Sequence, residues 1–171
     1  MSNNTAINLP QPKGWQKLNH RLASSRLGAW VFSRTFHHLD RFVLSLSGGR
    51  ATLGGLLTGL PLIALSTVGA KSGLPRSVPL VGIPDGQAIV LIASNWGQTQ
   101  HPAWYFNLRA QPQAEITRAG RTNKYLAHEA IGQEYDTYWN QAVNLYAGYA
   151  AYLKTAGDRH IPIMVLTPLD V

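Results

Sequence analysis

The sequence predicts a fold that is mainly β with helices (α+β), arranged as an antiparallel barrel of short strands. Two observations carry this prediction. Short apolar runs separated by hairpin turns recur along residues 62–131, and one long helical pattern precedes the last apolar run. A third observation argues against a doubly wound nucleotide-binding sheet, because no GxGxxG follows a strand pattern. We therefore expect a small barrel with a helix inserted before its final strand.

The predicted elements follow one another in a simple order. Residues 62–68 and 78–83 are strand-like, and Pro84-Asp85-Gly86-Gln87 is a turn that leads into the apolar run 88–94. Residues 103–110 have the length and composition of two helical turns. The remaining predicted elements are strands at 114–118 and 122–131 joined by a turn, a helix at 133–154, and a final strand at 160–166 that closes the sheet.

One domain is the expected size for this chain. With 171 residues, 45% apolar and 13% charged, it can bury a proper core and does not have the composition of a disordered protein. The absence of cysteine excludes disulfides and thiolate sites and suits a cytoplasmic location, and no signal peptide is expected. We divide the chain into a basic, amphipathic N-terminal helical region at 1–50 and a barrel domain at 51–171.

Positive charge is concentrated at the front of the chain. Residues 1–50 hold seven Lys or Arg and one acid, Asp40, while the whole chain has a net charge of +7. This region could pack on the barrel, rest on an anionic membrane surface or steer a polyanionic cofactor, and we favour packing combined with steering. No nucleic-acid-binding pattern organises the charge, and the adjacent His37-His38 pair lacks metal-site spacing. The uncharged run 51–68 is interrupted by three glycines and a proline, so we expect a loop and a strand there rather than a membrane span.

A glycine-rich basic loop joins the first two predicted strands. It reads Gly69-Ala70-Lys71-Ser72-Gly73-Leu74-Pro75-Arg76. Such a loop presents backbone N–H groups at close approach while Lys71 and Arg76 supply charge, which suits a bound phosphate or carboxylate. A solvated turn with two surface cations is the plainer interpretation, and the loop taken alone favours it.

A second loop, after the predicted strand 88–94, adds polar and aromatic groups. Ser94 and Asn95 are placed to hydrogen-bond a planar heterocycle, and Trp96 or Trp104 could pack against one. Trp104 and Leu108 are four residues apart, which favours the core face of a short helix for both.

Several ordered motifs together resemble a known family. GxKSGxPRxxPL, ASNWG and HPAWYxNLxAxP lie within residues 69–112, and two later motifs are Tyr146-x-x-Tyr149-x-x-Tyr152 and Arg159-x-Ile161-Pro162-Ile163. Over about residues 45–168 this combination resembles the deazaflavin (coenzyme F420)-dependent nitroreductase and quinone reductase family. The resemblance implies a split β-barrel of the FMN-binding, pyridoxamine-phosphate-oxidase type with N-terminal helices. It also implies coenzyme F420, an 8-hydroxy-5-deazaflavin with a phosphate and a glutamate tail.

The same resemblance implies roles for individual residues. The phosphate and tail-binding loop would consist of Lys71, Ser72, Gly73, Pro75 and Arg76. The deazaflavin ring would be bordered by Ser94, Asn95, Trp96 and Gly97, while Trp104 and Asn107 would hold the following helix against that site. Where many members have Thr-Thr-Gly-Arg-Lys and Lys-Gly, this chain has Thr67-Val68-Gly69-Ala70-Lys71 and Asn95-Trp96, which suggests a subgroup.

Three tyrosines complete the expected site. Tyr146, Tyr149 and Tyr152 advance by three along the predicted helix 133–154 and can present a strip of phenols to one cavity. An amphipathic helix packed by its aromatics also explains the pattern, and Tyr135 and Tyr138 are expected to be structural. By resemblance the three tyrosines line the substrate side of the deazaflavin, where their hydroxyls would hydrogen-bond the acceptor as it gains charge.

The implied activity is hydride transfer from reduced coenzyme F420 to a planar, electron-poor small molecule, such as a quinone, a nitroaromatic or an activated enone. Two alternatives stay open. One is an FMN-dependent split-barrel oxidoreductase, because the same barrel binds either ring, and the other is a non-catalytic cofactor-binding protein. Neither a metal nor a nucleic acid is expected as a partner, and the sequence does not indicate an oligomeric state.

Overall fold

The computed structural model describes residues 60–169. The expected N-terminal helical region at 1–50, the His37-His38 pair and the first half of the uncharged run 51–68 lie outside the described residues. No helix within 60–169 is long and apolar enough to cross a membrane.

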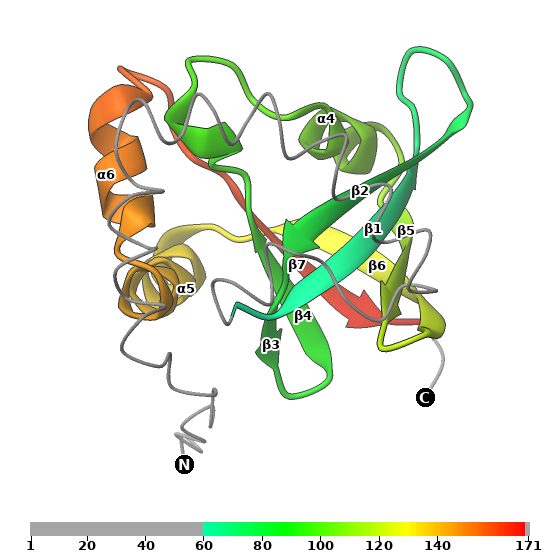
Figure 1. Ribbon diagram of the computed structural model, residues 1–171. Coiled ribbons are helices and arrows are strands. Elements are labelled where there is room, and N and C mark those ends of the chain that lie inside the picture. Colours follow the sequence, from blue (N-terminus) through cyan, green and yellow to red (C-terminus); the bar gives the residue numbers. More distant parts are fainter. Residues whose placement is uncertain (1–59, 170–171) are drawn as a thin grey trace.

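Seven strands form one antiparallel sheet (Figure 1). They are β1 (Leu62–Val68), β2 (Pro75–Val81), β3 (Ile83–Asp85), β4 (Ala88–Ile92), β5 (Gln113–Arg118), β6 (Arg121–Glu129) and β7 (Ile163–Pro168), in the spatial order β2-β1-β5-β6-β7-β4-β3. The two ends of this order, β2 and β3, are consecutive in the chain and are joined through Gly82. The sheet therefore curls back on itself, and the predicted antiparallel barrel is confirmed.

Short helices cover one end and one side of this barrel (Figure 1). They are η1 (Asn95–Gly97), a single 3₁₀ turn, followed by α4 (Ala103–Ala110), α5 (Gly132–Leu145) and α6 (Gly148–Thr155). α4 inserts Trp104, Tyr105 and Leu108 into an apolar cluster that fills the barrel. A second apolar cluster lies between the sheet and the α5–α6 pair, and it contains all three predicted site tyrosines. Trp104 and Leu108 therefore form the core face of α4, as their spacing predicted.

Two predicted strands have different bounds in the structure. The run predicted at 78–83 is divided, because β2 already begins at Pro75 and Gly82 separates it from β3. β3 includes Pro84 and Asp85, so the predicted four-residue turn shrinks to Gly86 and Gln87. The last strand is 163–168 rather than 160–166, and it lies between β6 and β4 in the sheet. The separate strand predictions at 62–68, 114–118 and 122–131 hold to within two residues.

The predicted continuous helix at 133–154 is wrong, because two helices occupy this stretch. α5 ends at Leu145, and Tyr146 takes an extended backbone conformation with φ −145° and ψ 104°. The Tyr146 ring then folds across Gly148 at the start of α6, so closely that a Cβ on Gly148 would collide with the ring carbons. Because only glycine leaves room for the ring, the local sequence permits a sharp break here where the residue pattern suggested a continuous helix.

Candidate functional site

The 69–74 loop is a compact turn between β1 and β2. Gly69 N donates to Leu74 O at 2.9 Å, and Gly73 N donates to Gly69 O at 2.8 Å. These bonds close the loop on itself and leave the Lys71 and Ser72 side chains exposed. The loop therefore has a defined shape rather than being a loose connection.

The side chain of Asn107 on α4 anchors this loop. Its Nδ2 donates to Thr67 Oγ1 at 3.0 Å in a buried contact, and its Oδ1 accepts from Ala70 N at 2.9 Å. Both halves of the amide are used, so the side chain fixes the end of β1 and the beginning of the loop together. The predicted role of Asn107 in holding α4 against the site is compatible with this geometry, and its part in cofactor binding stays a prediction.

The chemistry of the loop fits an anionic group. Lys71 and Arg76 form no ion pair within the described residues, and the backbone N–H of Lys71 donates to no described group. Ser72 Oγ accepts from Leu74 N at 3.3 Å, which leaves its own hydrogen available. Two exposed cations, a hydroxyl and a free N–H on one small loop are suitable donors for a phosphate or a carboxylate tail. Pro75 begins β2 beside them, and it too is exposed.

The η1 segment has an unusual backbone. Asn95 and Trp96 both have positive φ, 46° and 56°, a region in which residues other than glycine are uncommon. Asn95 Nδ2 donates to Gln100 O at 2.8 Å, which ties the segment to the chain beyond it. Gly97 packs so tightly on α6 that a Cβ there would collide with Thr155 and approach the Tyr152 backbone to 3.1 Å. Held in this form, η1 projects Trp96 outwards with 37% of its surface exposed.

Arg159 holds the η1 segment in place. Its Nη1 donates to Ala93 O at 3.0 Å, its Nη2 to Ser94 O at 2.6 Å and its Nε to Gln98 O at 2.8 Å. The accepting carbonyls flank the two positive-φ residues on both sides. A single guanidinium thus bridges the start and the end of the strained segment, which a flexible ammonium could not do with the same geometry.

His101 belongs to the same contact network. Arg159 Nη1 lies 3.2 Å from His101 Nδ1, and the imidazole packs against Tyr105 with ring centroids 5.0 Å apart. Burial lowers the pKa of His101, and the positive charge of Arg159 lowers this pKa further. A neutral imidazole can accept at Nδ1, so the contact is a hydrogen bond rather than a repulsion between two cations.

The three predicted tyrosines form a cluster rather than a strip on one helix. Tyr146 lies between α5 and α6, whereas Tyr149 and Tyr152 belong to α6. The Tyr146 and Tyr152 hydroxyls are 3.3 Å apart, and the Tyr149 ring meets each of the other two edge-on, with centroids 5.5 and 6.2 Å away. All three side chains are buried. The structure therefore brings the expected phenols together and also places them in the second apolar cluster.

Burial raises the pKa of each of these phenols above its usual range. For Tyr152, proximity to Tyr146 raises the pKa further, and Tyr149 experiences the same effect from Tyr146 to a smaller extent than from burial. For Tyr146, burial raises the pKa, while the hydrogen bond with Tyr152 acts in the opposite direction. The cluster consequently consists of neutral hydroxyls at any physiological pH, which can donate hydrogen bonds.

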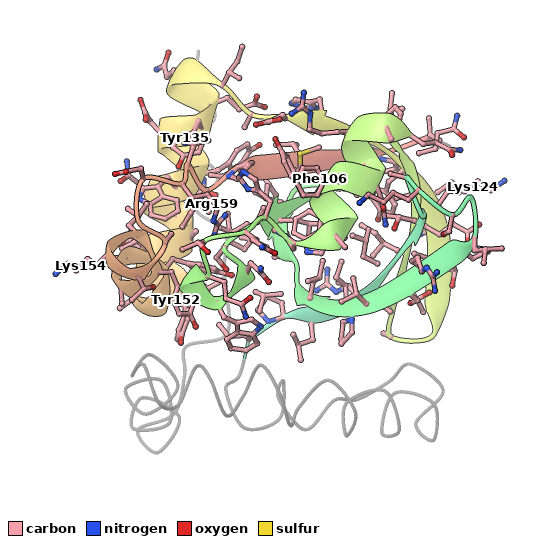
Figure 2. The ribbon with its side chains drawn as sticks, turned by 90° about the horizontal axis from the view of Figure 1, so that it is seen from above. Phe106, Lys124, Tyr135, Tyr152, Lys154 and Arg159 are labelled. Atoms are coloured by element: carbon pink, nitrogen blue, oxygen red, sulfur yellow. The ribbon has the colours of Figure 1, made fainter. Side chains whose placement is uncertain are left out.

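Trp96 connects the η1 segment to the tyrosine cluster. Its ring meets that of Tyr152 edge-on, with centroids 6.4 Å apart. Figure 2 shows Arg159 and Tyr152 on the same side of the barrel, with Phe106 of α4 across from them. The 69–74 loop, α4 and η1 all lie at one end of the barrel (Figure 1), so the sequence-predicted residues converge on one region.

Two contributors to this region were missed as site residues. Arg159 appeared only as part of a motif, and His101 only as the start of the helix motif. Their long-range contacts span 58 to 66 residues in sequence, and no local pattern encodes such contacts. Tyr105 adds a third contact of this kind, because its hydroxyl donates to Glu129 at 3.0 Å and joins α4 to β6.

Comparison with known proteins agrees with this geometry. Residues 39–168 match the family described as F420H(2)-dependent quinone reductase. The chain belongs to this family. An F420H(2)-dependent quinone reductase of Mycobacterium tuberculosis (strain ATCC 25618 / H37Rv) is 33% identical over 129 residues, which are 70% of this chain and 83% of the relative.

Two solved structures have the same fold and more than 30% sequence identity to this chain. An F420-H2 dependent reductase (FDR-A) has a TM-score of 0.57 and 34% identity, covering 62% of this chain and 93% of that chain. A protein described as a domain-swapped dimer has a TM-score of 0.59 and 31% identity, covering 81% of this chain and 97% of that chain. The predicted split barrel is therefore confirmed.

Family membership settles the class of enzyme. This F420H2-dependent reductase is an oxidoreductase, and its cofactor is coenzyme F420. The FMN alternative becomes secondary, and the non-catalytic alternative receives no support.

Proposed function

We propose that this reductase transfers a hydride from reduced coenzyme F420 to a quinone held beside the tyrosine cluster. The observation that carries the proposal is the contact between Trp96 and Tyr152, which joins the predicted ring-binding segment to the predicted acceptor side. Nitroaromatics and activated enones are proposed as further acceptors, because their oxygens accept hydrogen bonds from the same donors.

The 69–74 loop would hold the coenzyme tail. Lys71 and Arg76 provide exposed positive charge without a partner in the described part of the chain, and the Lys71 N–H and Ser72 hydroxyl provide directional donors. These groups lie on a closed turn anchored by Asn107, so little ordering is needed when an anion binds.

The η1 segment would border the deazaflavin ring. Ser94 ends a buried strand run, Asn95 is partly exposed, and Trp96 is 37% exposed. Arg159 fixes the backbone on both sides of this segment, so the edge presented to a planar ring is preorganised. When bound, the reduced coenzyme supplies the hydride.

The tyrosine cluster would enclose the acceptor and stabilise the charge that develops on its oxygen. Neutral phenols in an apolar surrounding are strong donors to such an oxygen, because water does not compete with them. Among the described residues, the Tyr149 hydroxyl has no hydrogen-bond partner, so it is the donor most readily available to an acceptor. The proton that completes quinone reduction would come from one of these hydroxyls or from water.

The test follows reoxidation of reduced coenzyme F420 with a naphthoquinone, a nitrobenzene derivative and a cyclic enone. We expect the quinone to be reduced fastest. Phenylalanine at 146, 149 or 152 keeps the ring and removes the donor. At least one of these three variants should lose turnover by roughly a hundredfold while binding the coenzyme normally. We expect Tyr149→Phe to be the most sensitive.

Tyr138→Phe is the matched control. The Tyr138 ring packs against the same apolar cluster, but its hydroxyl donates to Asp85 Oδ2 at 2.7 Å and joins α5 to β3. Its loss should reduce stability and leave the quinone turnover unchanged. Full activity in all three site variants would remove the tyrosine hydroxyls from the mechanism, and reduction of none of the acceptors would refute the proposed function.

A further inference from the structure

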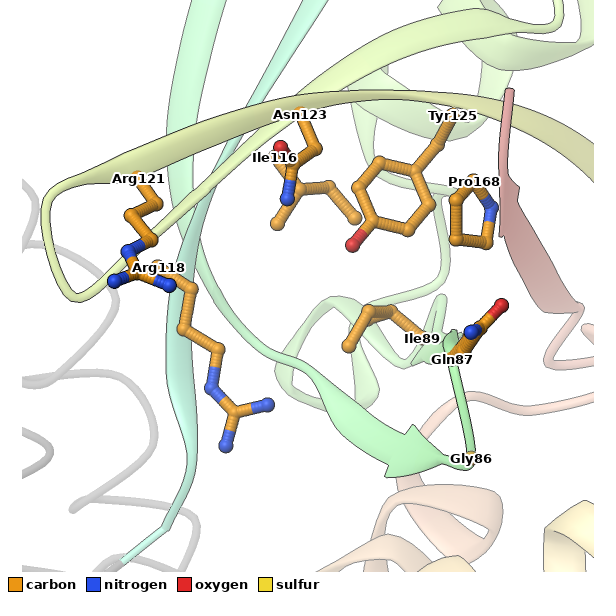
Figure 3. A pocket seen from close by; sticks show the side chains of 9 residues that line it. All are labelled: Gly86, Gln87, Ile89, Ile116, Arg118, Arg121, Asn123, Tyr125 and Pro168. Atoms are coloured by element: carbon orange, nitrogen blue, oxygen red, sulfur yellow. The ribbon is translucent and has the colours of Figure 1, made fainter. Parts of the chain in front are cut away.

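A cavity lies at the end of the barrel opposite the 69–74 loop and η1. It has a volume of about 410 Å³ and is lined by the β3–β4 turn, β4, β5, β6 and the end of β7 (Figure 3). The strand register fixes its place. β5 pairs with β1 so that Thr117 lies opposite Ala64, and Arg118 therefore lies near the start of β1, whereas the 69–74 loop follows the end of β1. The cavity is thus separate from the region assigned to coenzyme F420.

The walls of this cavity are the inward-facing residues of two paired strands. Side chains two residues apart along a strand share a face, so Arg118 shares a face with Ile116 on β5. By the same rule Arg121 and Asn123 share a face with Tyr125 on β6. Ile116 and Tyr125 belong to the apolar cluster that fills the barrel. The two arginines therefore continue inward-facing rows at the rim of the barrel, and these rows are apolar from Ile116 and Tyr125 inwards.

The positive charges of Arg118 and Arg121 face each other, and no described acidic side chain neutralises them. Arg118 pairs directly with Arg121 across the β5–β6 hairpin. Like charges in directly opposed positions destabilise a hairpin. Within residues 60–169 neither arginine forms an ion pair or a side-chain hydrogen bond. Two adjacent cations facing a cavity create a positive potential that an anion would neutralise.

The Tyr125 hydroxyl adds a hydrogen-bond donor to the cavity. Tyr125 is 8% exposed, and no described group forms a hydrogen bond with its hydroxyl. Figure 3 shows this hydroxyl pointing into the cavity, towards the space between Ile116, Ile89 and Arg118. A hydroxyl that faces the cavity and has no described protein partner is available to donate to a bound acceptor.

We propose that this cavity binds a small organic anion with an apolar body. The carboxylate or phosphate of the ligand would lie between Arg118 and Arg121 and accept a hydrogen bond from Tyr125. Its apolar body would rest on Ile89 and Ile116. The volume is within the range of small-molecule pockets, and an apolar floor with few convergent polar groups is typical of them. This site does not depend on the coenzyme or on the proposed acceptor.

The experiment compares two isosteric probes by isothermal titration calorimetry on the full chain, 2-naphthoate and the neutral 2-naphthamide. We expect saturable binding of 2-naphthoate and binding of 2-naphthamide that is weaker by at least about tenfold. Arg118→Gln and Arg121→Gln should each weaken 2-naphthoate binding by about tenfold, and Tyr125→Phe by a few-fold. Amide chemical shifts that change on titration should map to residues 116–125.

Lys124→Gln is the matched control. Lys124 lies on the same hairpin and carries the same charge, but it belongs to the opposite face of β6 and projects away from the barrel (Figure 2). The affinity of the Lys124→Gln protein for 2-naphthoate should equal that of the unaltered chain. Because both arginines are exposed and repel each other, the Arg118→Gln and Arg121→Gln proteins should melt at or above the temperature of the unaltered chain.

Three results would overturn the proposal. They are no saturable 2-naphthoate binding, equal affinity for 2-naphthoate and 2-naphthamide, and an equal effect of Lys124→Gln and Arg118→Gln. Reoxidation of reduced coenzyme F420 is expected to be the same in the Arg118→Gln protein as in the unaltered chain, so failure of this proposal and failure of the proposed function are distinguishable.

Discussion

Replacing Arg159 tests whether the η1 segment is held in a strained form for function. Arg159→Ala removes three donors to carbonyl oxygens on both sides of Asn95 and Trp96. Arg159→Lys keeps the positive charge but replaces the planar fork by one ammonium, which cannot reach both flanks of the segment. The two variants together separate the effect of charge from that of geometry.

The expected magnitude follows from the exposure of each bond. The bonds to Ala93 O and Ser94 O are part-buried, while the bond to Gln98 O is exposed and can be replaced by water. Counting about 1.5 kcal/mol for each part-buried bond and nothing for the exposed one, Arg159→Ala should lower the free energy of unfolding by about 3 kcal/mol. Arg159→Lys should recover about a third of this loss.

The loss should be local as well as global. Gly97 N donates to Ser94 O at 2.9 Å and Gln98 N to Asn95 O at 3.0 Å, so these two amides report on the segment. Urea unfolding gives the global loss, and native-state hydrogen exchange at residues 97 and 98 gives the local one. Coenzyme affinity should fall in both variants, because the segment predicted to border the ring is no longer held in one form.

Arg109→Ala is the control, since Arg109 is an exposed arginine at the end of α4 that contacts the Tyr105 ring from 5.8 Å. It should change neither exchange at 97 and 98 nor coenzyme affinity. Destabilisation by Arg159→Ala with unchanged exchange at these two amides would refute the argument that Arg159 positions η1. So would identical behaviour of Arg159→Ala and Arg159→Lys.

Three further predictions concern the loop, the helix break and pH. Lys71→Ala and Arg76→Ala should each raise the Michaelis constant for coenzyme F420 by about fivefold at low salt and leave turnover at saturation unchanged, which steady-state kinetics at two ionic strengths would check. Gly148→Ala should destabilise the fold by roughly 1–3 kcal/mol, because the new methyl group collides with the Tyr146 ring, and thermal or urea unfolding measures this loss. The folded-state pKa of His101 lies below its unfolded value of 6.5, so the unfolded chain takes up this proton first as the pH falls. The free energy of unfolding should therefore decrease as the pH drops below about 6.5. This decrease should be smaller in the His101→Asn protein, and urea unfolding at several pH values measures it.

The barrel could be predicted because most of its strands can be recognised from short stretches of sequence. The runs that became β1, β5 and β6 combine apolar or β-branched residues with bounding turns, and their bounds differ little from the predicted ones. The division of 78–83 could not be foreseen in the same way. Gly82 separates strands at opposite ends of the sheet order, so its role depends on closure of the whole barrel rather than on its neighbours in sequence.

The sequence indicates which residue types are candidates for a site, but it does not indicate the contacts that hold them in position. The basic loop and the Asn95-Trp96 pair carry unusual chemistry for a turn and can be recognised from the chain alone. Asn107 and Arg159 act through partners that lie 37 to 66 residues away, and such pairings are fixed only when β1, α4 and η1 have packed. Sequence spacing therefore indicates which groups are available, whereas the packed fold decides which of them hold the others in position.

The three tyrosines show how residues predicted to lie together can do so with a geometry that the sequence pattern does not indicate. A continuous helix would have rotated Tyr146 gradually away from Tyr152, since residues three apart drift around the axis. The break at Tyr146 instead brings the two hydroxyls to 3.3 Å and turns α6 so that Tyr152 meets Trp96 of η1. The break requires Gly148, and the contact with Trp96 requires Gly97, because either Cβ would collide with its neighbours. The region in which the predicted coenzyme-binding and acceptor residues meet therefore depends on two glycines that carry no chemistry of their own.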